Sequence, residues 1–390
     1  MRRVSFLYRT TLALFTFSAL SALAQQQPPR IVSPEISADH KVTFRIKAPK
    51  ASAVKVQGDW GSAELTKDND GLWSVTTGPL TPDFYSYTFS VDGVKTLDPL
   101  NPEIKQGLSS NDSMVFIRGD ESNFEDNAQV PHGQIREVWY NSKTLESQRR
   151  LHVYTPPGYD QSKQRYPVLY LLHGAGDEDS GWSTCGRAGF ILDNLLAAQK
   201  AKPMIIVMPN GSMPRPANMP VTAPGETPTP EAIAARAKLA DRFTNELMND
   251  IIPLVEKDFR VVADRDHRAI AGLSMGGGQT LRVLTTHPDD FSYVNIWSAG
   301  AGKDPADWEK RNEAFLNKAD EVNKSIKLLT ISIGEKDQGL ASAKGLSETL
   351  TKHGIKNEFK VSTGAHTWIN WRHYLNEILP RLAFAEDEKR

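Results

Sequence analysis

Apolar and polar positions follow two different rhythms along this chain of 390 residues. From residue 131 to residue 385, short continuous apolar runs typical of buried strands are separated by stretches with helical spacing. The runs expected to be strands are Ile135–Tyr140, Arg150–Thr155, Tyr166–Leu172, Met204–Met208, Ala269–Leu273, Tyr293–Trp297, Ile326–Ile333 and Asn357–Val361. Helices are expected over residues 240–258, over residues 280–286 and from Trp368 onward. Because strands that alternate with helices form a parallel sheet covered on both faces, this pattern predicts a doubly wound α/β domain with an antiparallel start.

The first third of the chain has a shorter rhythm. Apolar and polar residues alternate in four runs between turn signals such as Asp92-Gly93, and these runs are Val42–Ile46, Ala53–Gln57, Gly71–Thr76 and Tyr85–Val91. This spacing predicts an antiparallel β-sandwich over residues 31–118. The acidic, polar residues 119–130 are interpreted as a linker. Residues 211–230 are rich in proline and lack periodicity, which predicts a long loop near the carboxyl edge of the sheet, where it could border a pocket.

The amino-terminal 24 residues have the pattern of a targeting segment. Arg2 and Arg3 precede an apolar stretch over residues 11–20, and Ala22-Leu23-Ala24 forms an A-x-A cleavage site. We therefore expect a signal peptide, and a secreted or periplasmic protein without a membrane span. The single cysteine, Cys185, excludes an intramolecular disulfide, and the formal net charge of −1 argues against a nucleic-acid partner.

The most informative short motif is Gly272-Leu273-Ser274-Met275-Gly276, which follows an expected strand and precedes an expected helix. In this G-x-S-x-G motif the serine lies on a sharp strand-to-helix turn, and small neighbours let the two elements approach closely. The motif predicts that Ser274 is a nucleophile. The alternative is a glycine-rich helix N-terminus that binds an anion through its free N–H groups.

A nucleophilic serine needs a base, and the base needs an acid that orients it. Asp337 and His366 each follow a strand-like run downstream of Ser274, at the places where an acid and a base are expected. Glu335 is the rival acid, and His373, inside the helix expected from Trp368, is the alternative base.

The run that ends at Leu172 continues into His173-Gly174-Ala175-Gly176. This segment is similar to the HGGG-type loop of esterases, whose backbone N–H groups bind the oxygen of the tetrahedral intermediate. We assign these oxyanion donors to Met275 and to Ala175 (or Gly174), and we expect His173 to hold the loop. No metal-binding motif accompanies these residues, so we expect neither a metal nor a cofactor.

Two family resemblances add to this picture. The segments around Gly58-Asp59-Trp60, Gly71-Leu72-Trp73 and Asp98-Pro99 resemble an immunoglobulin-like, family-48 type carbohydrate-binding module, in which aromatic rings stack on sugars. Trp60 is the matched candidate for such a contact. The module either targets the protein to a polysaccharide, which we favour, or closes one side of the catalytic pocket.

The rest of the chain resembles the α/β-hydrolase esterase family that includes the feruloyl and acetylxylan esterases of carbohydrate esterase family 1. The residues that carry the resemblance span the domain in the family's order: Val153–Tyr159, Pro167–Gly174, Trp182, Ala271–Gly277, Gly334–Asp337 and Gly364–His366.

The resemblance implies a serine esterase that acts on feruloylated or acetylated arabinoxylan or xylo-oligosaccharide. Feruloyl esterase is the first choice, acetylxylan esterase the second and a siderophore esterase the third, and a non-catalytic carbohydrate-binding protein is the alternative of another class. Trp182 and Trp368 are candidates for the aromatic wall that would hold a cinnamoyl ring.

Overall fold

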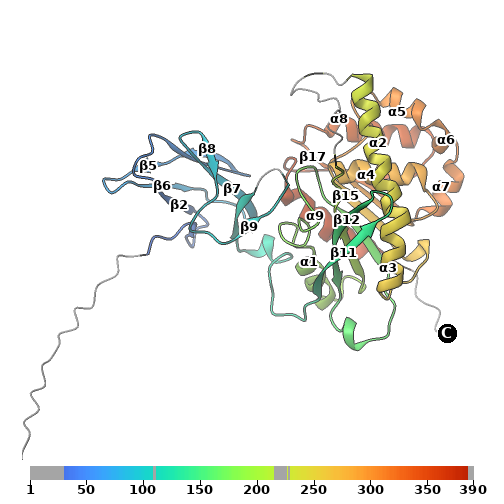
Figure 1. The fold of residues 1–390 in the computed structure, drawn as a ribbon, viewed down its shortest axis with the longest axis horizontal. Coiled ribbons are helices and arrows are strands. Elements are labelled where there is room, and N and C mark those ends of the chain that lie inside the picture. Colours follow the sequence, from blue (N-terminus) through green and yellow to red (C-terminus); the bar gives the residue numbers. More distant parts are fainter. Residues whose placement is uncertain (1–29, 109–110, 215–225, 227–228, 385–390) are drawn as a thin grey trace, which may run out of the picture.

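The computed structural model describes residues 30–108, 111–214, 226 and 229–384. The expected signal peptide and most of the loop expected over residues 211–230 lie outside these residues. The described chain forms two regions that lie side by side (Figure 1). We name them the N-terminal β region, residues 30–117, and the α/β region, residues 134–384.

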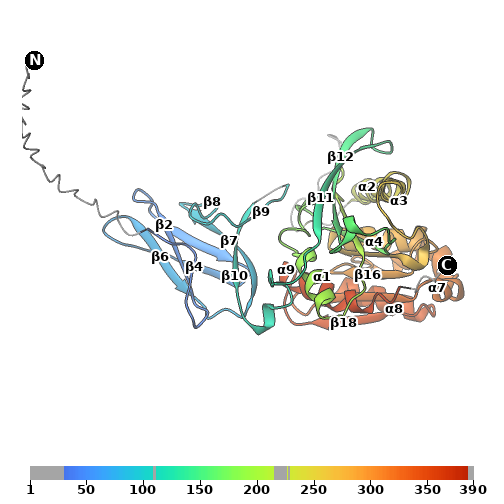
Figure 2. The same ribbon diagram turned by 90° about the horizontal axis from the view of Figure 1, so that it is seen from below.

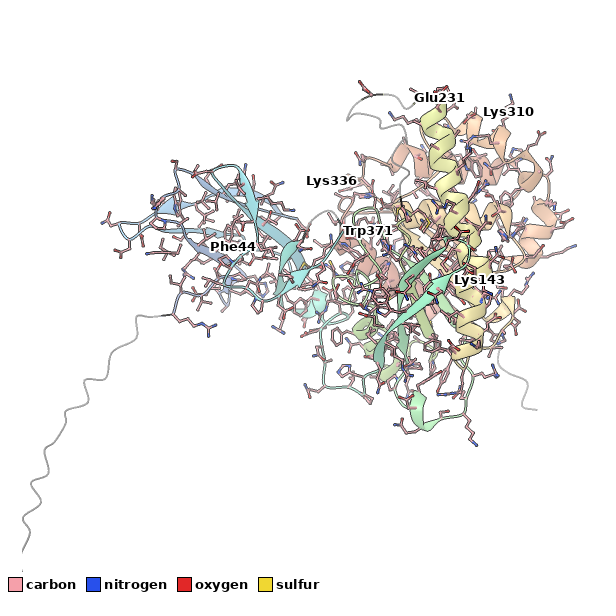
Figure 3. All side chains as sticks on the ribbon, viewed as in Figure 1. Phe44, Lys143, Glu231, Lys310, Lys336 and Trp371 are labelled. Carbon is pink, nitrogen blue, oxygen red and sulfur yellow. The ribbon has the colours of Figure 1, made fainter. Side chains whose placement is uncertain are left out.

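The N-terminal β region consists of two antiparallel sheets with strand orders β1-β2-β6-β5 and β4-β3-β7-β10-β9, and β8 pairs with β7. The strands are β1 (Glu35–Ile36), β2 (Val42–Lys47), β3 (Val54–Gly58), β4 (Gly61–Glu64), β5 (Thr66–Lys67), β6 (Leu72–Thr77), β7 (Asp83–Val91), β8 (Val94–Thr96), β9 (Ile104–Lys105) and β10 (Asp112–Ile117). Both sheets contribute to one core, in which Phe44 of β2 contacts Tyr87 and Phe89 of β7; Phe44 is labelled in Figure 3. The strands expected from the alternation are present, and the immunoglobulin-like assignment stays a prediction.

The α/β region is built on an eight-stranded sheet with the order β11-β12-β14-β13-β15-β16-β17-β18. Its strands are β11 (Gln134–Ser142), β12 (Ser147–Thr155), β13 (Val168–Leu172), β14 (Ile205–Pro209), β15 (Arg268–Leu273), β16 (Tyr293–Trp297), β17 (Leu328–Gly334) and β18 (Glu358–Ser362). β12 is antiparallel to β11 and β14. The remaining neighbours in the sheet are parallel, in the order β14-β13-β15-β16-β17-β18. The expected α/β sheet with an antiparallel start is therefore confirmed.

Helices cover both faces of this sheet (Figure 2). They are α1 (Ala188–Ala197), α2 (Pro230–Glu246), α3 (Ile252–Asp258), α4 (Met275–Thr286), α5 (Pro305–Arg311), α6 (Glu313–Leu316), α7 (Ala319–Ser325), α8 (Leu340–Lys352) and α9 (Trp368–Ile378). Apolar residues of α1 and α9 share one core cluster, and those of α2 to α8 share another. The helix expected over residues 240–258 begins earlier, at Pro230, because Thr229 caps its N-terminus and proline suits its first position.

The two regions are joined through buried charges. Arg372 of α9 pairs with Asp83 of the N-terminal β region at 2.6 Å and with Glu125 at 2.5 Å. Glu125, in the segment expected to be a linker over residues 119–130, is fully buried. This segment is therefore also part of the contact between the regions. Within the described residues, no helix has both the length and the apolar composition needed to cross a bilayer.

Candidate active site

Ser274 lies at the turn between β15 and α4, with backbone angles φ 53° and ψ −113°. A positive φ is strained for any residue other than glycine, and such strain is typical of functional sites. Small neighbours make the turn possible. A Cβ atom on Gly272 would lie 2.3 Å from the Gly276 carbonyl oxygen, and one on Gly276 would lie 2.6 Å from the His173 carbonyl oxygen. The strand, turn and helix expected around the motif are therefore present.

The structure brings Ser274, His366 and Asp337 together in one hydrogen-bonded chain. His366 Nε2 lies 2.9 Å from Ser274 Oγ, and His366 Nδ1 lies 2.8 Å from Asp337 Oδ2. The Asp337 side chain is fully buried, and its other oxygen accepts a bond of 2.8 Å from the Gly339 N–H. The imidazole is one-third exposed and is therefore open to a substrate. A base within hydrogen-bond distance of a hydroxyl, itself oriented by a buried acid, is the geometry that nucleophilic catalysis requires.

The rival residues lie elsewhere. Glu335 is exposed to solvent. His373 faces the N-terminal β region, where its Nε2 lies 3.1 Å from Asp83 Oδ2. Neither side chain is part of the hydrogen-bonded chain at Ser274.

The loop after β13 lies beside the turn that carries Ser274. A Cβ atom on Gly174 would lie 3.5 Å from the Ser274 Cβ atom, so the two segments are close neighbours. Ala175 lines the same cavity as Ser274, and Met275 begins α4, so the Met275 N–H has no acceptor within the helix. Ala175 therefore borders the cavity at Ser274, and Met275 directly follows Ser274 in the chain.

His173 is buried and holds this loop. Its Nε2 accepts a bond of 2.9 Å from the Gly211 N–H, so its Nδ1 carries the proton and donates to the Gly174 carbonyl oxygen at 2.8 Å. Burial lowers the pKa of His173, which favours this neutral form. Gln279 of α4 donates to the Gly211 carbonyl oxygen and fixes the start of the chain segment that follows β14.

A cavity of about 240 Å³ opens at Ser274 and is lined from both regions of the protein. The α/β region contributes Gly174, Ala175, Gly176, Asp177, Leu273, Ser274, His366, Thr367, Trp368 and Trp371, and the N-terminal β region contributes Asp59, Ser86 and Lys105. No local sequence pattern places these last three residues near Ser274, which lies 169 to 215 residues further along the chain. Trp371 was also missed, although its position one helical turn after Trp368 was a usable signal.

The tryptophans expected to contact substrate lie in different surroundings. Trp368 lines the cavity, as expected, although it is largely buried. Trp182 is only 1% exposed and packs behind Trp368, with its Nε1 donating to the Leu172 carbonyl oxygen, so the expectation that it contacts substrate is wrong. Trp60 is partly buried, stacks on Phe44 and packs against the core of the N-terminal β region. Figure 3 shows Trp371 in the part of the α/β region near the N-terminal β region.

Asp59 gives the cavity an acidic wall. Its Oδ2 accepts bonds from the backbone N–H and the hydroxyl of Ser86, at 2.7 and 2.9 Å. Asp59 is exposed to solvent where it borders the cavity.

Comparison with known proteins identifies relatives of this chain. An "Endo-1,4-beta-xylanase/feruloyl esterase" of Xylanibacter ruminicola is 30% identical over 358 residues, which is 90% of this chain and 46% of that protein. The chain therefore spans less than half the length of this curated relative.

Among solved structures, a ferulic acid esterase aligns with 28% identity and a TM-score of 0.53, over 64% of this chain and 97% of the other. The enterobactin esterase of Shigella flexneri aligns with 19% identity and a TM-score of 0.63, over 88% of this chain and 93% of the other, which shows a shared fold. The family model described as "Putative esterase" matches residues 142–382, which include Ser274, Asp337 and His366. The chain belongs to this family of α/β-hydrolase esterases.

Proposed function

We propose that this protein is a serine carboxylesterase and that Ser274, His366 and Asp337 form its catalytic triad. The hydrogen-bonded chain from Asp337 through His366 to Ser274 carries this proposal. Ser274 Oγ attacks the ester carbonyl carbon while His366 Nε2 accepts the hydroxyl proton. Asp337 holds the imidazole in the tautomer that keeps Nε2 free, and stabilises the imidazolium that forms.

The backbone N–H groups of Met275 and Ala175 (or Gly174) then stabilise the negative oxygen of the tetrahedral intermediate. When the C–O bond breaks, His366 donates its proton to the departing alcohol and an acyl-enzyme on Ser274 remains. Water then attacks the acyl carbon with His366 as the base, and the acid is released with Ser274 restored. Each oxyanion donor contributes about 3–4 kcal/mol of transition-state stabilisation in related enzymes.

We propose hydroxycinnamoyl esters of plant cell-wall polysaccharide, such as feruloylated arabinoxylan, as the substrate class. The similarity to feruloyl esterases supports this choice, and so does the position of Trp368 and Trp371 in the cavity wall. Among the described residues that line the cavity, the acids Asp59 and Asp177 outnumber the lysine, Lys105. This balance favours a neutral ester over the anionic complex that a siderophore esterase binds. The pattern of residues 1–24 supports export, and we propose that the protein acts outside the cytoplasm.

One pair of assays tests the proposal. Wild-type protein should release ferulate from methyl ferulate faster than acetate from acetylated xylan, and Ser274→Ala should abolish both activities. Preference for acetylated xylan would make acetylxylan esterase the better assignment. If Ser274→Ala turns over either substrate at the wild-type rate, the serine mechanism is refuted.

A further inference from the structure

The N-terminal β region provides one wall of the cavity at Ser274. This wall contains Lys105, which has no role in the mechanism proposed above. Lys105 is the last residue of β9 (Ile104–Lys105), a strand on the side of the N-terminal β region that faces the α/β region (Figure 2). Its Nζ lies 2.9 Å from Asp177 Oδ1 and 3.7 Å from Asp112 Oδ2. Asp177 belongs to the loop after β13, which carries the proposed oxyanion donor Ala175. A lysine of one region thus contacts the catalytic loop of the other.

This ion pair is shielded from water. The Lys105 side chain is 14% exposed and that of Asp177 is 7% exposed. Burial alone would lower the pKa of Lys105, but the Asp177 carboxylate more than offsets this effect, and the pKa is raised. The lysine is therefore charged at neutral pH. A shielded pair is screened less by salt than a surface pair, and it fixes the position of both partners.

A second contact lies next to the first. The Leu108 N–H, three residues after Lys105, donates to the Gly176 carbonyl oxygen at 2.9 Å. Gly176 has φ 85°, a conformation that glycine adopts readily, and the Asp177 N–H closes the turn on the Gly174 carbonyl oxygen at 3.3 Å. Residues 174–177 are thus held by the β9 segment at two adjacent points. On the opposite side they pack on the turn at Ser274, where a Cβ atom on Gly174 would lie 2.6 Å from Leu273 Cδ1.

We propose that Lys105 is a positioning residue of the esterase reaction: through Asp177 it holds residues 174–177 so that the Ala175 (or Gly174) N–H faces the oxyanion. The inference rests on the proposed function, since it requires an oxyanion at Ser274. Oxyanion donors act because they are fixed before charge develops. A loop that moves by a fraction of an ångström loses part of this effect without losing substrate binding.

The test uses the full chain and p-nitrophenyl acetate, a small ester whose turnover depends on the triad and not on the natural acyl group. Lys105→Met and Asp177→Asn should each lower kcat by about 10- to 100-fold, with KM within about twofold of wild type. Lys105→Arg should restore most of the activity, because a guanidinium can also reach the Asp177 carboxylate. Lys105→Met combined with Asp177→Asn should be no slower than the slower single variant.

Lys95→Met is the matched control. Lys95 belongs to the same region and pairs with Asp112 at 2.8 Å, but its side chain is half exposed and does not line the cavity at Ser274. This variant should keep wild-type kcat. A second readout is the rate of inactivation by a p-nitrophenyl phosphonate, whose adduct on Ser274 places an oxygen at the oxyanion position. This rate should fall by the same factor as kcat in Lys105→Met.

Three outcomes would overturn the proposal. Unchanged kcat in Lys105→Met would show that the loop does not need the lysine. A higher KM at constant kcat would show that Lys105 contacts the substrate instead. Additive losses in the double variant would show that the two residues act separately. If Lys105→Met does not fold, Asp177→Asn still carries the prediction of a lower kcat, and Lys105→Arg still carries the prediction of nearly wild-type kcat.

The test also separates this proposal from the assignment of the acyl group. Wild-type protein that cleaves p-nitrophenyl acetate but not methyl ferulate would contradict the proposed substrate and leave the role of Lys105 intact. If wild-type protein shows no turnover of p-nitrophenyl acetate that Ser274→Ala abolishes, both proposals are overturned.

Discussion

The buried contact between the two regions leads to a prediction about stability. Arg372 of α9 is fully buried, and it donates to the Asp83 carboxylate, to the Phe84 carbonyl oxygen and to the Cys185 carbonyl oxygen. It also pairs with the buried Glu125 carboxylate. Although burial raises the pKa of Asp83, hydrogen bonds from His373 and Arg372 lower it to about 2, so Asp83 is ionised at neutral pH. Arg372→Met removes the cation and leaves two acids without a partner: Asp83, which is fully ionised at neutral pH, and Glu125, whose pKa of about 7 leaves it partly ionised.

The magnitude follows from the burial of the partners. Breaking a buried ion pair by removing one member costs about 3–5 kcal/mol, because the remaining charge is left without compensation. Asp83 is 3% exposed and Glu125 is fully buried, so neither can turn to water without a change in the fold. Arg372→Met combined with Asp83→Asn and Glu125→Gln should recover most of this loss, because it removes the unpaired charges as well.

The free energy of unfolding can be measured by urea denaturation, followed by tryptophan fluorescence and by circular dichroism. Arg381→Met is the matched control, since Arg381 makes two bonds of 2.7 Å to Glu358 but this pair is largely exposed. We expect the control to lose less than about 1 kcal/mol. A loss in Arg372→Met no larger than that of the control would refute the reasoning, because it would show that the buried acids do not depend on Arg372.

Three further predictions concern the triad, Glu125 and the N-terminal β region. His366→Ala should lower kcat on p-nitrophenyl acetate by about 10⁶-fold and Asp337→Ala by somewhat less, because the triad acts as a unit; loss in His373→Ala with activity kept in His366→Ala would refute the assignment of the base. Burial raises the pKa of Glu125 from 4.5 to about 7, so the folded state keeps a proton that the unfolded chain releases, and stability is lost as the pH rises through this window. The free energy of unfolding should therefore fall more in the wild type than in Glu125→Gln as the pH rises from about 4.5 to about 7, and parallel pH profiles would contradict this. A chain without residues 30–118 should lose activity even on p-nitrophenyl acetate, or fail to fold; a folded truncation with wild-type kcat would show instead that the region only targets the enzyme.

The sequence predicted those parts of the site that depend on local chain geometry. Ser274 could be found because a turn between a buried strand and a helix requires glycine at positions 272 and 276. Asp337 and His366 could be found because parallel strands end at the same edge of a sheet. Each of these residues lies directly after a strand, so its place in the fold follows from its place in the chain.

The remaining parts depend on packing between distant segments, which apolar periodicity does not encode. The same pattern could not distinguish Trp368, which lines the cavity, from Trp182, which packs behind it. A large aromatic residue after a strand is compatible with either place. Glu125 was assigned to a linker because it lies among acidic residues, and only the fold shows that Arg372 compensates its charge.

The contacts of the N-terminal β region lead to a different view of what this region does. Lys105 contacts the loop that carries Ala175, and Asp83 contacts α9, which begins just after His366. The region therefore contacts two segments that border the cavity at Ser274, the loop that carries Ala175 and the helix that follows His366. Buried ion pairs contribute little net stability compared with apolar packing, but they fix one arrangement of the segments that they join. Two such contacts at the borders of one cavity are what a region that completes an active site requires, whereas a freely tethered targeting module would need neither.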